Sequence, residues 1–227
     1  MRVAALYDVH GNLPALEAVL DELGEHSDLI VVGGDFLAGP QPAETLERLR
    51  ELGNRARFIR GNVERELVEP SPPRPAGPPP GVIDELKAKL TQEQIEFAFG
   101  LPQQEVLEID GLGRTLFCHA TPRNDEEIVT PASSEHRFRE VLAGVDADVV
   151  VVGHTHMQHD RVVGGIRFVN AGSVGMPYED APGAYWALLG PDVEFRRTEY
   201  EAVEYEDFEF PQATRAEATE YFESLVE

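Results

Sequence analysis

The chain has 227 residues, of which 42% are apolar, and a formal net charge of −23. This excess of negative charge repels polyanions, so long nucleic acid is not expected as a partner. The single cysteine, Cys118, excludes an internal disulfide and a thiolate cluster, and the absence of a long apolar run or leader sequence predicts a cytoplasmic protein with no membrane partner.

The first 62 residues alternate between predicted strands and predicted helices. Strands are expected at 2–7, 29–32 and 56–59, and helices at 13–24 and 42–53. The apolar residues of the first helix fall on one stripe, as in a helix that packs on a sheet. Strand–helix alternation of this kind predicts a parallel sheet with right-handed crossovers.

Residues 70–81, PSPPRPAGPPPG, interrupt this alternation. Seven prolines in twelve residues favour an extended, semi-rigid loop, because proline lacks the amide hydrogen that helices and central strands need. Helical sequence resumes at Val82, so we interpret the loop as an insertion and not as a domain boundary. A capping box formed by Thr91 and Gln94 predicts a further helix that ends near Phe99.

The second half of the chain is rich in predicted strands. They are expected at 104–109, 114–118, 149–152, 158–163, 166–170, 184–189 and 193–200, with helices at 133–144 and 212–226. We therefore expect one α/β domain over 1–227, with two mixed sheets packed face to face and helices on the outer faces. Residues 201–227 form an acidic strand and helix extension in this prediction, which we interpret as a solvated face.

The stretch 149–159, VVVVGHTHMQH, places two histidines directly after a run of valines that is typical of a buried strand. If the chain stays extended through Thr155, His154 and His156 point to the same side. Such a pair is either half of a metal site or a hydrogen-bonded structural pair. His159 has the opposite parity and is not expected to be a ligand.

Four other predicted strands also end in residues that can bind metal. Asp8 and His10 follow the first strand, and Asp35, Asn62 and His119 follow later ones. Each residue alone has a structural explanation, such as a helix cap, a turn or a part-buried histidine. The carboxyl edge of an α/β sheet is where ligands bind, so five strand ends with suitable ligand atoms indicate a metal site.

The ordered motifs DVH, GGD, GNVE, H and GHTH resemble those of the calcineurin-like metallophosphoesterase superfamily. The resemblance covers residues 2–175, and NAGSVGMP (170–177) resembles a further loop of the family. Within the family, the match is to the small prokaryotic phosphodiesterase branch. The resemblance implies a four-layer α/β/β/α sandwich, which agrees with the two sheets expected from the sequence pattern.

The resemblance also implies a ligand set for two divalent metal ions. The first ion would be bound by Asp8, His10, Asp35 and His156, and the second by Asp35, Asn62, His119 and His154, so that Asp35 bridges them. Two ions about 3.5–4 Å apart can share a hydroxide and orient a phosphate ester for in-line attack. Nitrogen and oxygen ligands suit manganese, our first expectation, and also iron, zinc, nickel or cobalt.

We assign catalytic roles to Asp35, Asn62 and His119, and substrate contacts to Asn62, Arg123 and Ser173. For Arg123 a surface salt bridge is an equal alternative, and for Ser173 a tight turn. Many relatives carry histidine where this chain has Val63, and that histidine helps to protonate the leaving group. Because losing a general acid matters most for basic leaving groups, we expect activity on small phosphodiesters, above all activated ones.

Two other functions remain open at this point. The first is a dinucleoside polyphosphate hydrolase or phosphatase. The second is a non-catalytic binding scaffold on the same fold, like the vacuolar sorting subunit of retromer, although all seven expected ligand positions carry competent atoms. The acidic tail leaves a homo-oligomer open as well, and the proline loop 70–81 is placed to overhang the site.

Overall fold

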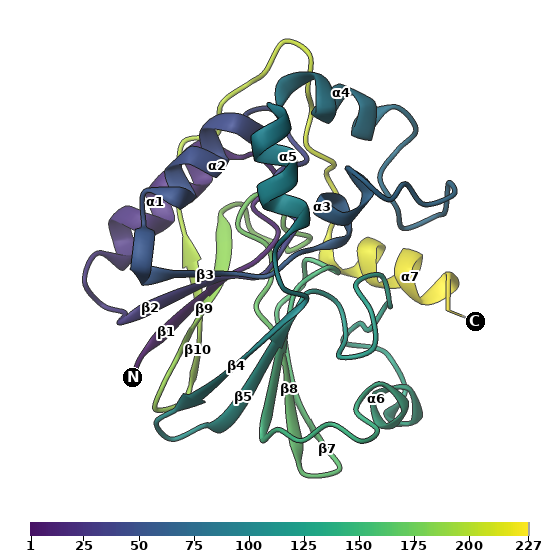
Figure 1. Ribbon diagram of the computed structural model, residues 1–227. Helices are drawn as coiled ribbons and strands as arrows, with labels where there is room; N and C mark the ends of the chain where they lie inside the picture. Colours follow the sequence, from purple (N-terminus) through teal and green to yellow (C-terminus); the bar gives the residue numbers. More distant parts are fainter. Residues whose placement is uncertain (227) are drawn as a thin grey trace.

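In the computed structural model, residues 1–226 are described, and they form two five-stranded mixed sheets that pack face to face (Figure 1). The first sheet has the order β10-β9-β1-β2-β3, with β1 (Val3–Leu6), β2 (Leu29–Val32), β3 (Ala56–Phe58), β9 (Ala184–Leu189) and β10 (Val193–Thr198). The second has the order β4-β5-β6-β8-β7, with β4 (Gln104–Ile109), β5 (Gly113–Cys118), β6 (Val149–Val152), β7 (His159–Val163) and β8 (Ile166–Asn170).

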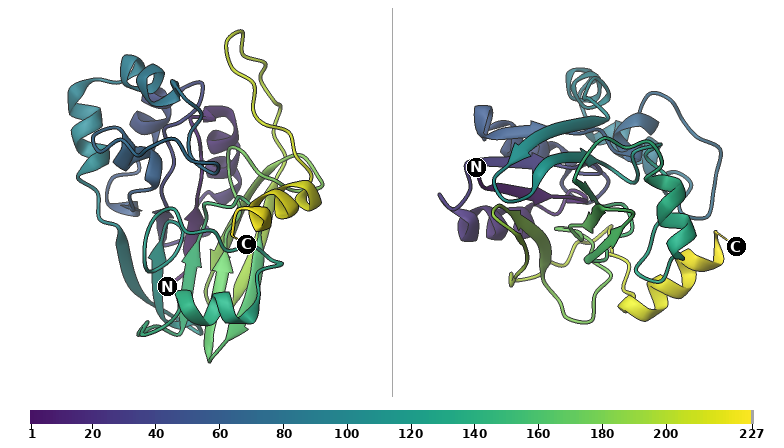
Figure 2. Two further views of the ribbon diagram at one scale, coloured as in Figure 1. Left: turned by 90° about the vertical axis from the view of Figure 1, so that its right-hand side faces the viewer. Right: turned by 90° about the horizontal axis from the view of Figure 1, so that it is seen from below.

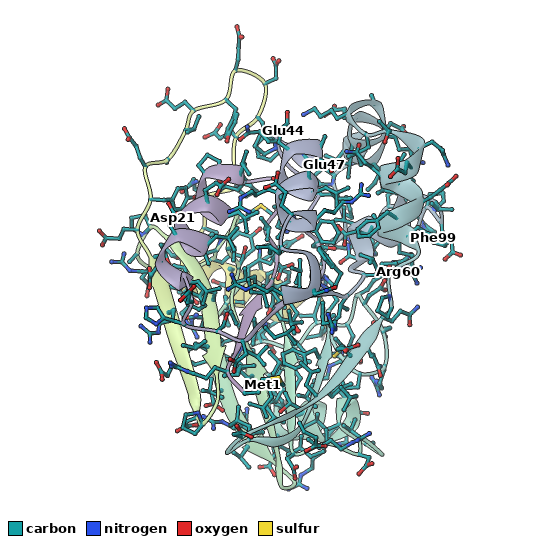
Figure 3. All side chains as sticks on the ribbon, turned by 60° about the vertical axis from the view of Figure 1, so that its left-hand side comes forward. Met1, Asp21, Glu44, Glu47, Arg60 and Phe99 are labelled. Atoms are coloured by element: carbon teal, nitrogen blue, oxygen red, sulfur yellow. The ribbon has the colours of Figure 1, made fainter. Side chains whose placement is uncertain are left out.

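Helices cover the outer faces of both sheets. The first sheet packs against α1 (Leu13–Leu23), α2 (Pro42–Arg50), α3 (Asn62–Glu66), α4 (Val82–Lys89) and α5 (Gln92–Phe99), with a short 3-10 turn at Gly53–Arg55. The second sheet packs against α6 (Glu135–Val141), and α7 (Arg215–Ser224) packs in a separate cluster. Figure 3 shows Asp21 on α1 and Glu44 and Glu47 on α2, all of them exposed on this outer layer. Among the residues described, no helix is long and apolar enough to cross a membrane.

Alternation along the strands explains the four layers. In β1, Ala4 and Leu6 pack against the helices of the first sheet, whereas Val3 and Ala5 pack between the sheets. In β6, Val149 and Val151 face the first sheet, whereas Val150 and Val152 pack against α6. The valine run is therefore buried on both faces, and the predicted α/β/β/α sandwich is confirmed.

The parallel strands bring the motif-bearing strand ends together. Strand β2 pairs in parallel with both β1 and β3, and β6 pairs in parallel with both β5 and β8. The loops that follow these strands therefore leave each sheet at one edge. Helix α7 lies across this edge, beside α3 and the loop that precedes α4 (Figures 1 and 2).

Two local predictions differ from the structure. The GNVE motif, expected in a loop, begins the short helix α3, in which the Glu64 carboxylate supplies the capping contacts to the backbone. In the C-terminal extension, α7 forms as expected, but residues 201–214 contribute only an isolated bridge between Tyr205 and Phe208 and no strand. Figure 2 shows this segment as a long loop that rises from β10 before the chain returns to α7.

Candidate metal centre

The loops that follow β1, β2 and β6 turn tightly at the predicted ligand residues. Five non-glycine residues of the described chain have positive φ: Asp8 (52°), His10 (47°), Asp35 (49°), His154 (66°) and His156 (59°). This left-handed conformation costs an L-residue roughly 1–2 kcal/mol, so it persists only where the surrounding structure imposes it. All five residues belong to the predicted ligand set, and backbone strain is therefore concentrated at the site.

These turns overturn one prediction about the histidine pair. The chain does not stay extended through Thr155, because His154 and His156 both adopt positive φ. The two imidazoles consequently join different groups of potential ligands instead of pointing together as strand neighbours. His159, which we excluded as a ligand, lies in β7 beside Phe168 with 5.7 Å between ring centroids.

Six of the predicted ligands form two buried groups. Within each group, the potential ligand atoms lie within 4.8 Å of one another, and the groups are Asp8, His10 and His156, and Asp35, His119 and His154. The two groups adjoin, because His119 Nε2 lies 3.4 Å from Asp35 Oδ2 and 3.9 Å from Asp8 Oδ1. With Asn62, which lies between members of the second group, we call these seven residues the ligand cluster.

Each of the four histidines in the ligand cluster contacts a backbone carbonyl through one ring nitrogen. The pairs are His10 Nδ1 with Ala38 O (3.1 Å), His119 Nδ1 with Gly33 O (3.0 Å), His154 Nε2 with Glu126 O (3.2 Å) and His156 Nδ1 with Met176 O (2.7 Å). A carbonyl only accepts, so the contacting nitrogen carries the hydrogen. When the ring is neutral, the lone pair of the other nitrogen is directed into the cluster, as in histidines that bind metal.

Two polar groups in the ligand cluster lack partners that the protein itself supplies. Asp8 Oδ1 is buried without a hydrogen bond. The amide oxygen of Asn62 faces other acceptors, at 3.2 Å from Asp35 Oδ2, His119 Nε2 and His154 Nδ1. Reversing the amide would give these three atoms a donor but would add none for Asp8 Oδ1. Cations between the oxygens and nitrogens satisfy every one of these atoms, so the residues fit a pair of metal ions.

The pKa values of His10, His154 and Asp35 favour the protonation states that metal ligands need, whereas that of His119 favours the protonated ring. Burial lowers the pKa of His10 and of His154 to about 4, so both imidazoles are neutral at pH 7. Burial opposes ionisation of Asp35, but the adjacent His119 outweighs it and lowers the pKa of this carboxyl. Burial likewise opposes a charge on His119, yet Asp35 raises its pKa to about 10. Metal binding would therefore release a proton from His119.

Glycines beside the two carboxylates leave room for them. A Cβ atom at Gly61 would lie 2.2 Å from Asp35 Oδ1, and one at Gly153 would lie 2.3 Å from Asp8 Oδ2. The backbone amides beside these glycines contribute as well, since Val63 N donates to Asp35 Oδ1 at 2.9 Å and His154 N donates to Asp8 Oδ2 at 2.8 Å. One oxygen of each carboxylate is thus fixed by backbone, and the other is directed into the cluster.

Glu64 is a functional neighbour that the sequence did not reveal as such. Its buried carboxylate accepts hydrogen bonds from Asp35 N (2.8 Å), Phe36 N (3.1 Å) and Gly61 N (3.0 Å). It therefore ties the loop after β2 to the start of α3, and these two segments carry Asp35 and Asn62. The motif GNVE contains the signal, a carboxylate two residues after a ligand, but its direction depends on α3.

The two predicted substrate contacts besides Asn62 do not line the cavity over the ligand cluster. The half-exposed Arg123 guanidinium pairs with Glu127 and does not line the cavity over the cluster. Ser173 Oγ is buried, donates to Asp8 O at 2.7 Å and accepts from Met176 N at 2.8 Å. Ser173 thus contacts the backbone of a ligand residue, and direct contact of either side chain with substrate remains a prediction.

A cavity of about 420 Å³ opens above the ligand cluster. On one side it is lined by His10, Asp35, Asn62, His154 and His156. Most of the remaining surface is apolar, and we call the following residues the apolar wall: 75–79, Val82, Met176, Tyr178, Phe208, Pro211, Tyr221 and Phe222. The predicted position of the proline loop over the site is thus observed.

Comparisons with known proteins agree with this geometry. A model of the calcineurin-like phosphoesterase superfamily domain matches residues 1–190. Phosphodiesterase YfcE of Escherichia coli K12 is 28% identical over 203 residues, which cover 85% of this chain and 89% of that protein. A metallophosphoesterase structure from Sphaerobacter thermophilus has a TM-score of 0.69 at 27% identity, covering 88% and 89% of the two chains. The fold also matches protein PH1004 of Pyrococcus horikoshii, with a TM-score of 0.74, 24% identity and 88% coverage of each chain.

Proposed function

The chain belongs to the calcineurin-like phosphoesterase superfamily and is a phosphoester hydrolase, and from that premise we propose that it is a dinuclear metal-dependent phosphodiesterase. The observation that carries this proposal is the ligand cluster, in which four backbone-anchored histidines and two carboxylates converge below a cavity. The resemblance to a phosphodiesterase supports the same reaction class.

We assign Asp8, His10, Asp35 and His156 to one ion and Asp35, Asn62, His119 and His154 to the other. The two groups found in the fold support this division. The 3.9 Å between His119 Nε2 and Asp8 Oδ1, which belong to different groups, supports two adjacent ions, and we assign the bridging role to Asp35. When bound, two divalent ions supply the positive charge that binds a phosphoryl group and acidify a water for in-line attack at phosphorus. Manganese is the first candidate among the metals that such ligands suit.

The protein groups then orient the reactants. The carbonyl contacts fix the imidazole rings, and the backbone amides of Val63 and His154 fix one oxygen of each carboxylate. The apolar wall reduces the access of bulk water to the phosphoryl group and so strengthens the electrostatic interactions of the site. Asn62 faces both the second group of ligands and the cavity, which places its amide beside a bound ester.

Preference for diesters follows from Val63. This side chain lines the cavity at the position where many relatives carry a histidine that protonates the leaving group. Glu64 does not replace that histidine, because its carboxylate accepts three backbone hydrogen bonds and does not line the cavity. Esters with acidic leaving groups need no such proton, so activated diesters are the substrates that this site suits best.

A dinucleoside polyphosphate is a less suitable substrate for this cavity. Each additional phosphate brings negative charge that needs a cation or several hydrogen-bond donors. Among the described residues that line the cavity, none is lysine or arginine, and Glu209 adds negative charge. A purely structural scaffold would have no need of the strained, buried ligand residues.

The proposal is tested with manganese-loaded protein and two chromogenic esters. We expect bis(p-nitrophenyl) phosphate to be hydrolysed at least ten times faster than p-nitrophenyl phosphate, and about two manganese ions per chain by elemental analysis. Faster hydrolysis of the monoester would refute the diester assignment. A stoichiometry of one ion with full activity would refute the dinuclear mechanism.

A further inference from the structure

The apolar wall is formed by two segments that are far apart in the sequence. The proline loop contributes residues 75–79, and the C-terminal segment contributes Phe208, Pro211, Tyr221 and Phe222. The C-terminal residues lie beyond the region matched by the family model, which ends at residue 190. One of the two segments that form the wall therefore lies outside the part of the chain that the family model matches. Figure 1 shows α7 next to α3 and the loop that follows it.

Side-chain contacts fix both segments of the wall. Tyr221 Oη donates to Pro75 O at 3.2 Å and thereby links α7 directly to the proline loop. Arg74 Nη2 lies 2.5 Å from Glu66 Oε1 and 3.0 Å from Glu126 Oε1, which fixes the loop to α3 and to the segment before α6. Helix α7 is fixed in turn by Glu223, which accepts from Ser133 Oγ at 2.6 Å.

Aromatic rings continue from the wall to the ligand cluster. Tyr178 is stacked on His156, with ring centroids 5.1 Å apart and an interplanar angle of 17°. Phe222 follows at 6.1 Å from Tyr178, and Tyr221 at 5.6 Å from Phe222. Flat, weakly polar surfaces of this kind bind aromatic groups through burial and ring contacts. With no lysine or arginine among the described lining residues, the wall offers nothing to a second anionic group.

We propose that the apolar wall is a specificity site that binds an uncharged aryl group attached to the phosphorus that the ligand cluster binds. This inference rests on the proposed function for the position of the phosphoryl group. It goes further in naming the organic part of the ester and the residues that select it. Tyr178, Tyr221, Phe222 and the proline loop are the specificity-determining elements, and the metal ligands are not.

The direct test compares the binding of two simple anions that differ only in their organic group. Phenylphosphonate and methylphosphonate are titrated calorimetrically into manganese-loaded protein. We expect phenylphosphonate to bind the wild type at least tenfold more tightly, since burying one ring removes on the order of 100 Å² of apolar surface from water. The two anions differ in intrinsic acidity by the same amount for every variant, so changes in their affinity ratio report on the wall.

Variants separate the wall from the ligand cluster. Tyr221→Ala removes the link to Pro75 from a side chain that is 49% exposed, and Ala76→Trp fills the cavity. Both should lower the phenyl-to-methyl ratio about tenfold and leave methylphosphonate affinity unchanged. Phe195→Ala on β10 is the matched control, because this exposed aromatic lies outside the cavity. An unchanged ratio in both wall variants would overturn the inference.

The same measurements distinguish failure of this inference from failure of the proposed function. A selective phenylphosphonate complex in a protein that hydrolyses no diester would refute the phosphodiesterase proposal and leave the aryl site standing. Rapid hydrolysis of bis(p-nitrophenyl) phosphate together with equal affinity for both phosphonates would support the phosphodiesterase and refute the aryl site. Failure of phenylphosphonate to bind would refute the aryl site as well.

Discussion

The ligand cluster and the apolar wall border the same cavity but are built in different ways. The cluster is set on strand ends, and its side chains are positioned by backbone amides and carbonyls within tight left-handed turns. The wall consists of a proline loop and a C-terminal segment, which are joined to the rest of the protein by side-chain contacts such as Tyr221 with Pro75. Its surface is mostly apolar, whereas the cluster is entirely polar.

We infer from this difference that the ligand cluster carries out the reaction and that the apolar wall selects the substrate. Backbone positioning on a sheet edge leaves little freedom to the cluster, because a change in one loop displaces one of the potential metal ligands. Loops that contact the core through side chains tolerate substitution and insertion more easily. Substitutions in the apolar wall can therefore change its shape without changing the reaction. Variants of the ligand cluster should change reaction rate and metal binding, whereas variants of the wall should change substrate affinity.

The largest effect is expected at Asp35, which we assign to both ions. Asp35→Asn keeps the shape of the side chain but removes the charge, so we expect hydrolysis of every ester to fall by about a thousandfold or more, equivalent to about 4 kcal/mol. Initial rates and metal content measure this. The exposed Asp21→Asn on α1 is the matched control and should retain full activity. A variant at Asp35 that keeps more than a tenth of the wild-type rate would remove the basis for the bridging assignment.

A smaller loss is expected when the space beside Asp35 is filled. The Cβ atom of a Gly61→Ala variant would meet Asp35 Oδ1 at 2.2 Å and Asp35 N at 2.5 Å, so the carboxylate must shift. Displacement of a positioned catalytic group by about 1 Å can cost on the order of 100-fold in rate. We expect that loss in kcat/KM, equally for all substrates, together with weaker manganese binding.

Gly53→Ala provides the control for Gly61→Ala. A Cβ atom at Gly53 would have no neighbour within 4 Å, although φ there is +54°. This substitution should lower stability by about 1 kcal/mol through backbone strain and leave kcat/KM unchanged. If Gly61→Ala and Gly53→Ala had the same effect on rate, the space beside Asp35 would not be what matters.

A variant that loosens the apolar wall should change the KM for the substrate without changing the affinity for manganese. Arg74→Met removes the ion pairs of the proline loop with Glu66 and Glu126 but keeps an apolar stem. We expect KM for bis(p-nitrophenyl) phosphate to rise about tenfold, since breaking a largely buried ion pair frees the loop. Manganese affinity, measured by titration, should stay constant.

The control for Arg74→Met is Arg167→Met, which removes comparable ion pairs with Asp160 and Asp192 far from the cavity. It should alter neither KM nor metal affinity. Loss of manganese from Arg74→Met would contradict the independence of the two regions. That outcome would indicate coupling through Glu126, whose carbonyl accepts from His154.

The sequence predicts the cluster far better than the wall for a physical reason. Each cluster motif is local, because a ligand atom directly follows a strand, with a glycine beside it in all of them but the His119 motif, and parallel pairing brings such strand ends to one edge. Asp8, Asp35 and His119 could therefore be assigned before the fold was known. The direction of His154 and His156 could not, because it depends on left-handed turns that a period of two does not describe.

The wall depends on contacts that no local pattern encodes. The prolines at 70–81 predict an extended loop, and the loop does lie over the site, but its partner across the cavity is separated from it by more than a hundred residues. Nothing in residues 201–227 except their charge stands out in the sequence, and their aromatic residues gain meaning only from the position of α7. The role of Glu64 likewise follows from helix α3 and not from its motif.

The smallest expected effect concerns His159, which resembles the cluster histidines without being a ligand. It is buried in β7, its Nδ1 contacts Met157 O at 3.2 Å, and burial lowers its pKa to about 4. The unfolded imidazole has a pKa near 6.5 and takes up a proton as pH falls, whereas the folded one does not. This histidine therefore lowers the free energy of unfolding by about 1 kcal/mol between pH 7.5 and pH 5.5.

Denaturant titrations of wild type and His159→Phe at the two pH values isolate this contribution. The wild type should lose about 1 kcal/mol more than the variant on acidification, because phenylalanine carries no proton in either state. The difference should be the same with saturating manganese and with chelator, since no ligand of the cluster changes. A difference that disappears when manganese is bound would place His159 among the groups that respond to the metal, and the separation of core histidine from ligand histidine would then fail.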